Sequence, residues 1–326
     1  HGLRLTDDAI RRITAQTEGW PALTMLAAIT VARHHDGASV HVSGADLPIG
    51  DYLRLEVLER QTPERARFLK ETSILEHLSG PLCDAVTGGP DSATTLRHLA
   101  HSTVLIDAYG GRYRYHPLLR EFLLEELQAQ DPQLVIGLHQ RASVWYESAG
   151  DLDTAIRHAF AAGDLDRAAT LLSVSFLQQF WTARHAALMA WLGQFGDEEI
   201  RRRPWLAVLA AFKELEVGNT AAAGHYAELA ERGSFHGPPP DGSVSFESER
   251  AMLRVLMARG GAEQMLVSAS FAAEQEGDGP WGPLALWFLA TARQVNGDLE
   301  VVDGILEKAV ASARAYANSG LAYSVA

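Results

Sequence analysis

The residue whose position best suits chemistry is His116, which lies between an alternating segment, Arg112–Tyr115, and an apolar run that starts at Pro117. The alternation predicts a short strand, and the spacing of apolar residues after Pro117 predicts an amphipathic helix. The first turn of a helix offers free N–H groups and a positive dipole, and an imidazole there adds a further donor. His116 is therefore a candidate for binding an anion, and a capping or core histidine is the alternative interpretation.

A second set of candidates consists of aromatic and charged residues after residue 200. If Gly218, Gly260 and Gly297 lie in turns between paired helices, these residues fall on one concave face. Flat aromatic rings with a few oriented polar groups suit a sugar, because its C–H faces pack on rings while its hydroxyls need hydrogen-bond partners. The predicted ligand-binding residues are Trp205, Phe212, Glu247, Arg250, Arg254, Trp287, Gln294 and Tyr323, and the same register adds Val208, Leu215, Glu216, Met257, Leu284 and Thr291 to the face.

Two other interpretations of this face stay open. Tryptophan is common in the cores of helical repeats, so the tryptophans could belong to the core. Alternatively, the repeats form a scaffold that binds a protein or peptide partner. A long open groove with ladders of charge would favour a peptide, and a closed pocket with tryptophan and paired Arg and Glu would favour a small polar ligand.

No constellation of catalytic residues is predicted. The sequence offers no triad, metal cluster or carboxylate pair with predictable geometry, and His34-His35 lack further ligands at useful spacing. Cys83 occupies an apolar helical position, which favours a buried filler over a nucleophile. There is no G-x-x-x-x-G-K-[ST] motif, so ATP hydrolysis through that site is not expected from this chain. We therefore expect no enzyme activity, no metal and no cofactor in the chain itself.

Two patterns divide the first 130 residues. Residues 1–45 read as two helices separated by the sequence TEGWP, in which Pro21 suits a helix start. Residues 46–130 read as three or four helices, then TVLIDA, YGG and RYRYH as strand, turn and strand, and then a trailing helix. Helices followed by a β-hairpin wing and a last helix predict a winged-helix domain.

Residues 131–326 carry internal repeats. The segments AGDLDTAIRHA at 149–159 and AGDLDRAATLL at 162–172 are near copies, NGDLEVVDGIL at 296–306 is a third version, and VGNTAAAGHYA at 217–227 is a looser fourth. Glycine closes one helix and the short polar residue caps the next. The predicted fold is therefore mainly α, with a winged-helix domain followed by a tetratricopeptide-like superhelix that continues beyond the last residue.

The composition limits the partners. A net charge of −13 argues against nucleic-acid binding by the whole chain. The helix before the wing offers only Arg97 and His98 to DNA, and the run Arg201–Arg203 adjoins three acidic residues, which is typical of a solvated helix end. One cysteine, no signal peptide and no long apolar run predict a cytoplasmic location without a membrane.

The order of five segments adds a family resemblance. The segments TEGWPALTMLAA, FLKETSILEHLSGPLCDAVTG, RYRYHPLLREFLLEEL, LHQRASVWYESAGDLDTAIRHAFAAGDLDRAATLL and LMAWLGQFGDEEIRRRPWLAVLAAF follow one another. Together they resemble the middle of the large ATP-dependent LuxR-type transcriptional activators, the MalT-like group of signal-transduction ATPases, over residues 10 to about 230.

The resemblance implies a longer parent protein. An ATPase with a P-loop precedes this segment, residues 1–45 end that module, and a helix-turn-helix domain that binds DNA follows the repeats. It also implies a slow ATPase, a small-molecule inducer, and self-association on activation. In such proteins ADP locks the resting state, and a histidine at the start of the last winged-helix helix points at its phosphates, a position that His116 matches. The GWP sequence matches an element whose proline, here Pro21, packs on adenine.

Overall fold

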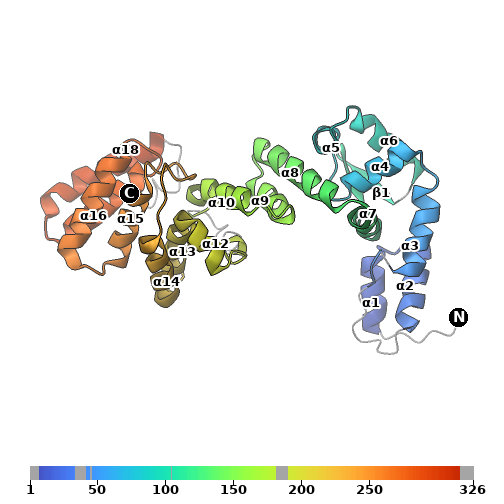
Figure 1. Cartoon of the computed structure of the whole chain (residues 1–326), viewed down its shortest axis with the longest axis horizontal. Helices are drawn as coiled ribbons and strands as arrows, with labels where there is room; N and C mark the ends of the chain where they lie inside the picture. Colours follow the sequence, from blue (N-terminus) through green and yellow to red (C-terminus); the bar gives the residue numbers. More distant parts are fainter. Residues whose placement is uncertain (1–6, 34–41, 45, 104, 181–189, 316–326) are drawn as a thin grey trace. The chain divides into compact units, whose positions relative to one another are not determined.

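The computed structural model describes residues 7–33, 42–44, 46–103, 105–180 and 190–315. These residues belong to two compact units, residues 1–165 and 166–326, and each unit has its own packing (Figure 1). The described elements are helical except for one β-hairpin, so the predicted mainly α class is confirmed.

The first unit begins with a helical hairpin. Helices α1 (Asp7–Gln16) and α2 (Pro21–Arg33) are joined by the predicted turn, in which Glu18 and Gly19 have φ values of 46° and 73°. Pro21 takes the first position of α2, where its missing N–H costs no hydrogen bond. Leu23 and Ala27 of α2 are fully buried, which packs this hairpin onto the core of the unit.

The winged-helix domain follows. Its helices are α3 (Leu47–Leu53), continued by a π-helical turn at Arg54–Leu58, then α4 (Pro63–Thr72), α5 (Gly80–Thr87) and α6 (Ser92–Ser102). The wing consists of β1 (Ile106–Tyr109) and β2 (Arg112–Tyr115), and α7 (Pro117–Gln130) is the trailing helix. The predicted strand, turn and strand are confirmed.

The wing closes the core of this domain. Strands β1 and β2 pair antiparallel with Ile106 opposite Tyr115, and the turn uses Gly110 and Gly111 at φ values of 55° and 77°. Glycine suits both positions because it has no Cβ to clash at positive φ. Tyr115 is buried, and its hydroxyl contacts Thr72 Oγ1 at 2.7 Å.

The end of α4 differs from the sequence prediction, and the burial of Cys83 agrees with it. The sequence predicts a helix through Leu75, but α4 ends at Thr72 because the chain turns there to form a β-bridge between Leu78 and Tyr113. Cys83 is fully buried, as predicted, and burial raises the pKa of its thiol to about 12.

Helices α8 (Pro132–Ser148) and α9 (Leu152–Ala161) pack with the winged-helix domain. Helix α8 lies against α5, and Arg141 Nε donates to the carbonyl oxygen of Val86 at 2.5 Å (Figure 1). By packing, the described structure divides after Leu165. The boundary that the sequence predicts after residue 130 falls between α7 and α8, and the assignment of α8 and α9 to the repeat domain stays a prediction.

The second unit is built from helix pairs. Helix α10 (Leu165–Phe180) and the short α12 (Asp197–Arg202) precede three hairpins of antiparallel helices. The first hairpin is α13 (Pro204–Glu216) with α14 (Thr220–Arg232), the second is α15 (Phe246–Met257) with α16 (Gly261–Glu276), and the third is α17 (Gly282–Val295) with α18 (Val302–Ala315), preceded by a 3-10 turn at Leu299–Val301.

The turns between paired helices contain the predicted glycine and the polar capping residue that follows it. Gly218 and Gly297 have φ values of 78° and 87°, which glycine adopts without steric cost. Asn219 then caps α14 by accepting a hydrogen bond from the Ala222 N–H at 3.3 Å, and Asp151 caps α9 in the first unit in the same way. Gly260 is the exception, because its φ is −93° and Ala258 and Gly261 take the positive values instead.

Candidate functional site

His116 is buried at the start of α7 with both ring nitrogens engaged. Its Nδ1 accepts a hydrogen bond from the Leu118 N–H at 3.2 Å, so it is the N-cap of the helix. Its Nε2 lies 3.0 Å from the carbonyl oxygen of Thr17 and must donate, because that oxygen can only accept. The imidazole thus joins the winged helix to Thr17, which directly follows α1 and lies two residues before Gly19 of the GWP element.

The turn that His116 holds also carries Pro21. Arg114 on the wing pairs with Glu18 at 2.9 Å, which is a second link from the winged helix to this turn. The Trp20 ring packs against the core, and Pro21 is exposed. The side chain proposed to pack on adenine is therefore accessible, while the imidazole proposed to contact phosphate is occupied by Thr17.

In the second unit, the first helices of the three hairpins form an apolar groove of about 300 Å³. Helices α13, α15 and α17 each contribute side chains to it, and Glu216 is its one charged residue. Trp287 is half-buried and lies beside Phe288, with ring centroids 5.3 Å apart. The groove is lined by Phe212, Leu215, Glu216, Leu256, Leu284, Trp287 and Phe288, five of which the sequence places on the concave face.

Glu216 has a local partner at the edge of this groove. The side chain of Lys213, on the same helix, is fully buried, and its Nζ lies 3.3 Å from Glu216 Oε2. A buried ammonium needs a nearby carboxylate, so Glu216 has a structural role besides any contact with a ligand.

Trp205 does not reach this groove. Its side chain is 5% exposed and lies in the first turn of α13, in the core of the unit. The alternative interpretation, in which the tryptophans are core residues, therefore describes Trp205. It also describes Trp281, which stacks on Phe176 with the ring centroids 6.0 Å apart.

The predicted polar residues of α15 lie elsewhere. Arg254 binds Glu231 of α14 through Nε and Nη2, both at 2.6 Å, and Glu247 through Nη1 at 2.7 Å. Arg250 donates to Glu247 and lies over the Phe246 ring, 4.9 Å from its centroid. These charges join α15 to α14, where Arg254 and Met257 line a different pocket, of about 280 Å³.

A shift in register explains this difference. Helix α13 ends two residues before Gly218, whereas α15 ends three residues before Gly260. A register counted from the glycines is thus one residue late in α15, and one residue rotates a side chain by about 100° around a helix. Counting from the helix ends places Leu256, and neither Arg254 nor Met257, at the position of Leu215. Arg250 and Arg254 therefore pair with Glu247 and Glu231, and they do not line the groove that Trp287 lines.

Two further predicted ligand-binding residues are not found in the groove. Gln294 is exposed near the end of α17 and does not line the groove. Tyr323 lies outside the described residues.

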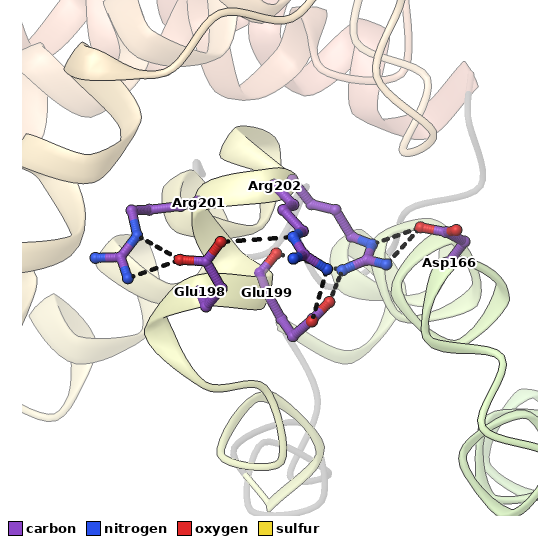
Figure 2. A network of polar contacts seen from close by, with 6 residues as sticks. Asp166, Glu198, Glu199, Arg201 and Arg202 are labelled. Carbon is purple, nitrogen blue, oxygen red and sulfur yellow. Dashed lines mark hydrogen bonds and ion pairs between the residues drawn. The ribbon is translucent and has the colours of Figure 1, made fainter.

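The arginine run Arg201–Arg203 is held by acidic neighbours, as Figure 2 shows. Within the same short helix, Arg201 pairs with Glu198, and Arg202 pairs with both Glu198 and Glu199. Arg203 binds Glu199 at 2.6 Å and also Asp166 at the start of α10, which ties α12 to that helix. Arg201 and Arg202 are exposed, as a solvated helix end predicts, whereas the side chain of Arg203 is largely buried. This run presents no concentrated positive face to nucleic acid.

The second unit contains a group of buried carboxyl groups that the sequence analysis does not predict. Asp241, in the connection between α14 and α15, is 8% exposed, Glu249 on α15 is 1% exposed and Glu276 at the end of α16 is 2% exposed. Glu276 accepts hydrogen bonds from Ser243 Oγ at 2.7 Å and from the Val244 N–H at 3.3 Å. Neither carboxyl oxygen of Glu249 accepts a hydrogen bond from the described part of the chain.

The surroundings of Glu249 favour its neutral form. Burial raises its pKa well above the ordinary value, and the negative charges of Asp241 and Glu276 add to the effect. Burial also raises the pKa of Asp241. A carboxyl group with a raised pKa in the folded state stabilises the fold fully below its unfolded pKa, and this stability is lost as the pH rises through the folded pKa.

We therefore expect Glu249→Gln to stabilise the second unit at pH 7 to 8. Glutamine keeps the shape of the neutral acid and removes the cost of burying a charge or binding a proton, which corresponds to a rise of several degrees in the melting temperature. Calorimetry between pH 5 and pH 8 measures the effect, with Glu263→Gln on the exposed face of α16 as control. A lower melting temperature for Glu249→Gln at pH 8 would show that the native carboxylate is ionised and paired.

Two negative findings concern the described ranges only. No group of three or more His, Cys, Asp or Glu side chains in them has a geometry that could hold a metal ion. Every helix within them is too short or too polar to traverse a bilayer.

The described elements form a winged helix followed by helix hairpins of the tetratricopeptide type. The model of the MalT winged helix domain matches residues 54–135. The matched residues are those in which the structure has α4 to α7 and the wing, so this part of the chain is similar to that domain.

Curated relatives extend the similarity beyond the winged helix. MalT, an HTH-type transcriptional regulator of Vibrio cholerae, is 29% identical over 218 residues, which are 63% of this chain and 24% of MalT. MalT of Serratia proteamaculans is 28% identical over 212 residues. The serine/threonine-protein kinase PknK of Mycobacterium tuberculosis is 32% identical over 176 residues, which are 52% of this chain and 16% of PknK.

A solved structure shares the architecture. The STAND protein PH0952 of Pyrococcus horikoshii, a signal transduction ATPase with a tetratricopeptide repeat sensor, aligns over 99% of this chain and 56% of its own, with a TM-score of 0.50 and 14% identity. This similarity supports the fold alone. Since the chain spans between about a sixth and a quarter of the curated relatives, kinase activity does not follow from the match to PknK.

Proposed function

We propose that this chain is the inducer-sensing and switch region of an ATP-dependent LuxR-type transcriptional regulator. The observation that carries the proposal is the groove across α13, α15 and α17, which lies in the repeat array of a chain with a MalT-type winged helix. A ligand that contacts three hairpins at once has a different affinity for two arrangements of those hairpins, and such a difference is what a switch requires.

The ligand we propose is a small polyhydroxylated molecule, namely an oligosaccharide. Trp287, Phe212 and Phe288 provide the aromatic surface on which the C–H faces of a sugar pack. Glu216 is exposed at the edge and is placed to accept a hydrogen bond from a hydroxyl.

The apolar character of the groove supports the second candidate, a peptide-binding scaffold. Only one charged residue lines it, and it is open to solvent, so the apolar side of a peptide helix would also fit. The two functions differ in their ligands and share the same groove, so competition between ligands distinguishes them.

The remaining functions belong to the longer protein. We propose that it binds ATP and ADP through an ATPase module before this chain, binds DNA through a helix-turn-helix domain after it, and self-associates in the cytoplasm when the inducer binds. Within this chain we assign no catalytic residue.

The experiment is a thermal-shift screen of the chain against linear and branched oligosaccharides, repeated with Trp287→Ala. We expect at least a tenfold loss of affinity for any oligosaccharide that stabilises the parent chain, because a stacked ring contributes about 1.4 kcal/mol or more. Phe271→Ala, which removes an exposed ring from α16, is the control and should bind normally.

Two results would reject the sugar. If Trp287→Ala binds the oligosaccharide as the parent does, the groove is not its site. If an amphipathic peptide binds in the groove and no sugar competes with it, the peptide scaffold is the better description.

A further inference from the structure

A second cavity lies in the first unit, between the winged-helix domain and the helices that follow it. Its volume is about 470 Å³, within the range of small-molecule sites. One wall comes from the segment before α5 and from the wing, and the other from the end of α8 and from α9. It is lined by Glu76, His77, Leu78, Ser79, Leu82, Arg112, Trp145, Tyr146, Ala149, Asp151, Thr154 and Arg157.

The two walls are fixed to each other on both sides of this cleft. Arg157 of α9 forms an ion pair with Glu76, and Arg141 of α8 donates to Val86 of α5. The cleft therefore exists before any ligand binds, which lowers the cost of binding.

The wall from α8 is aromatic. Trp145 and Tyr146 are half-buried, and their rings meet edge to face with centroids 5.1 Å apart. Tyr146 stacks on His158, which is buried behind it, with centroids 5.4 Å apart and planes within 10°. The position of the Tyr146 ring is thus set from behind, and the wall offers an apolar surface to a flat or ring-shaped ligand.

Some of the charged side chains that line the cleft already have partners. Glu76 already neutralises Arg157, and Asp151 accepts a hydrogen bond from the Thr154 N–H at the start of α9. The guanidinium of Arg112 is the exception, because it makes no hydrogen bond or ion pair with any residue in the described ranges. The hydroxyl of Ser79, at the start of α5, caps no N–H of that helix. One cation and one hydroxyl are therefore available to an anionic group.

We propose that this cleft binds a small phosphomonoester that carries a ring. The phosphate is held by the Arg112 guanidinium, which can donate two parallel hydrogen bonds to it, and the ring packs on Trp145. A sugar phosphate and a nucleoside monophosphate share this chemistry. The site is separate from the groove of the proposed inducer, which lies in the other unit.

Such a ligand would act on the packing between two elements. Arg112 lies on the wing and Trp145 on α8, so one molecule that contacts both strengthens the attachment of α8 and α9 to the winged helix. Binding stabilises the unit by an amount that grows with the ligand concentration, and thereby links the winged helix to the level of a metabolite.

The test uses the 326-residue chain with AMP, glucose 6-phosphate, adenosine, glucose and inorganic phosphate as probes. We expect AMP or glucose 6-phosphate to quench tryptophan fluorescence saturably and to give a matching isotherm in calorimetry. The compound without its phosphate, and inorganic phosphate alone, should bind at least about tenfold more weakly. Binding of AMP alone identifies a nucleotide site, and binding of glucose 6-phosphate alone identifies a sugar-phosphate site.

Three variants locate the site. Arg112→Gln and Trp145→Leu should each weaken binding about tenfold or more, since each removes one of the two contacts. Arg97→Gln, on the exposed face of α6, and Trp287→Ala, in the other unit, should leave it unchanged, which also separates this site from the proposed inducer groove. The proposal is overturned if neither phosphomonoester binds at millimolar concentration, if inorganic phosphate binds as tightly as both, or if Arg112→Gln binds like the parent chain.

Discussion

Acidification from about pH 6.5 to about pH 3 is expected to destabilise the first unit by on the order of 4 kcal/mol through His158 alone. His158 on α9 is 4% exposed, and its Nδ1 lies 2.8 Å from Nδ1 of His139 on α8. One of the two nitrogens donates and the other accepts, so at least one of the two rings is neutral in this arrangement.

The pKa values set the direction and the range of this effect. The pKa of His158 is lowered to about 3. Burial is the largest cause, His139 and Arg157 also lower the pKa, and Glu76 raises it by a smaller amount. Burial and then Arg120 lower the pKa of His139 to about 4. A histidine with a lowered pKa contributes stability that is present above its unfolded pKa and is lost as the pH falls toward its folded pKa.

The measurement is the free energy of unfolding of the chain in urea as a function of pH. In His158→Gln the slope between pH 6.5 and pH 4 should fall by up to about half, because the variant cannot take up that proton whereas His139, whose pKa is also lowered, still contributes. His98→Gln on the exposed face of α6 is the matched control and should keep the parental slope. An unchanged slope in His158→Gln would show that the pair is already protonated, or open to water, in the native state.

The parts of the fold that local chemistry determines could be predicted from the sequence. The wing follows from the alternation around Gly110 and Gly111, and the hairpins follow from glycine with a capping Asn or Asp. These patterns are short-range, since a positive φ or an N-cap involves only a few neighbouring residues.

The parts that depend on packing could not be predicted in the same way. The register of α15 depends on where the helix ends, and Ala258 ends it in a left-handed conformation that no glycine marks. The attachment of α8 and α9 to the winged helix depends on long-range contacts such as that of Arg141 with Val86. The burial of Glu249 beside Asp241 is a third example, because a glutamate in a helix normally predicts an exposed position.

His116 is the residue for which the sequence and the structure suggest different partners. The resemblance implies a contact with ADP phosphates, and in this chain the Nε2–H is donated to Thr17, at the end of the α1 segment. One nitrogen cannot serve both acceptors, so a phosphate contact requires release of the Thr17 carbonyl. That exchange replaces a neutral acceptor with a charged one, and hydrogen bonds to charged groups are the stronger kind. We therefore propose that His116 exchanges partners when ADP binds, and that the turn before Pro21 responds.

In the longer protein, His116→Asn is expected to speed the release of ADP by about tenfold or more, since a hydrogen bond to a charged group contributes about 1.5–3 kcal/mol. Asparagine is a good N-cap, so the variant keeps the hydrogen bond to the start of α7, and its shorter side chain loses the donor that reaches Thr17 or phosphate. His116→Ala removes both contacts and should also lower the melting temperature of the 326-residue chain, which separates the loss of the cap from the loss of the phosphate contact. Release of a fluorescent ADP analogue from the longer protein measures the rate, and transcription without inducer should rise in both variants. If His116→Asn releases ADP at the parental rate, His116 is a capping residue that joins α7 to Thr17, and the nucleotide is held by other groups.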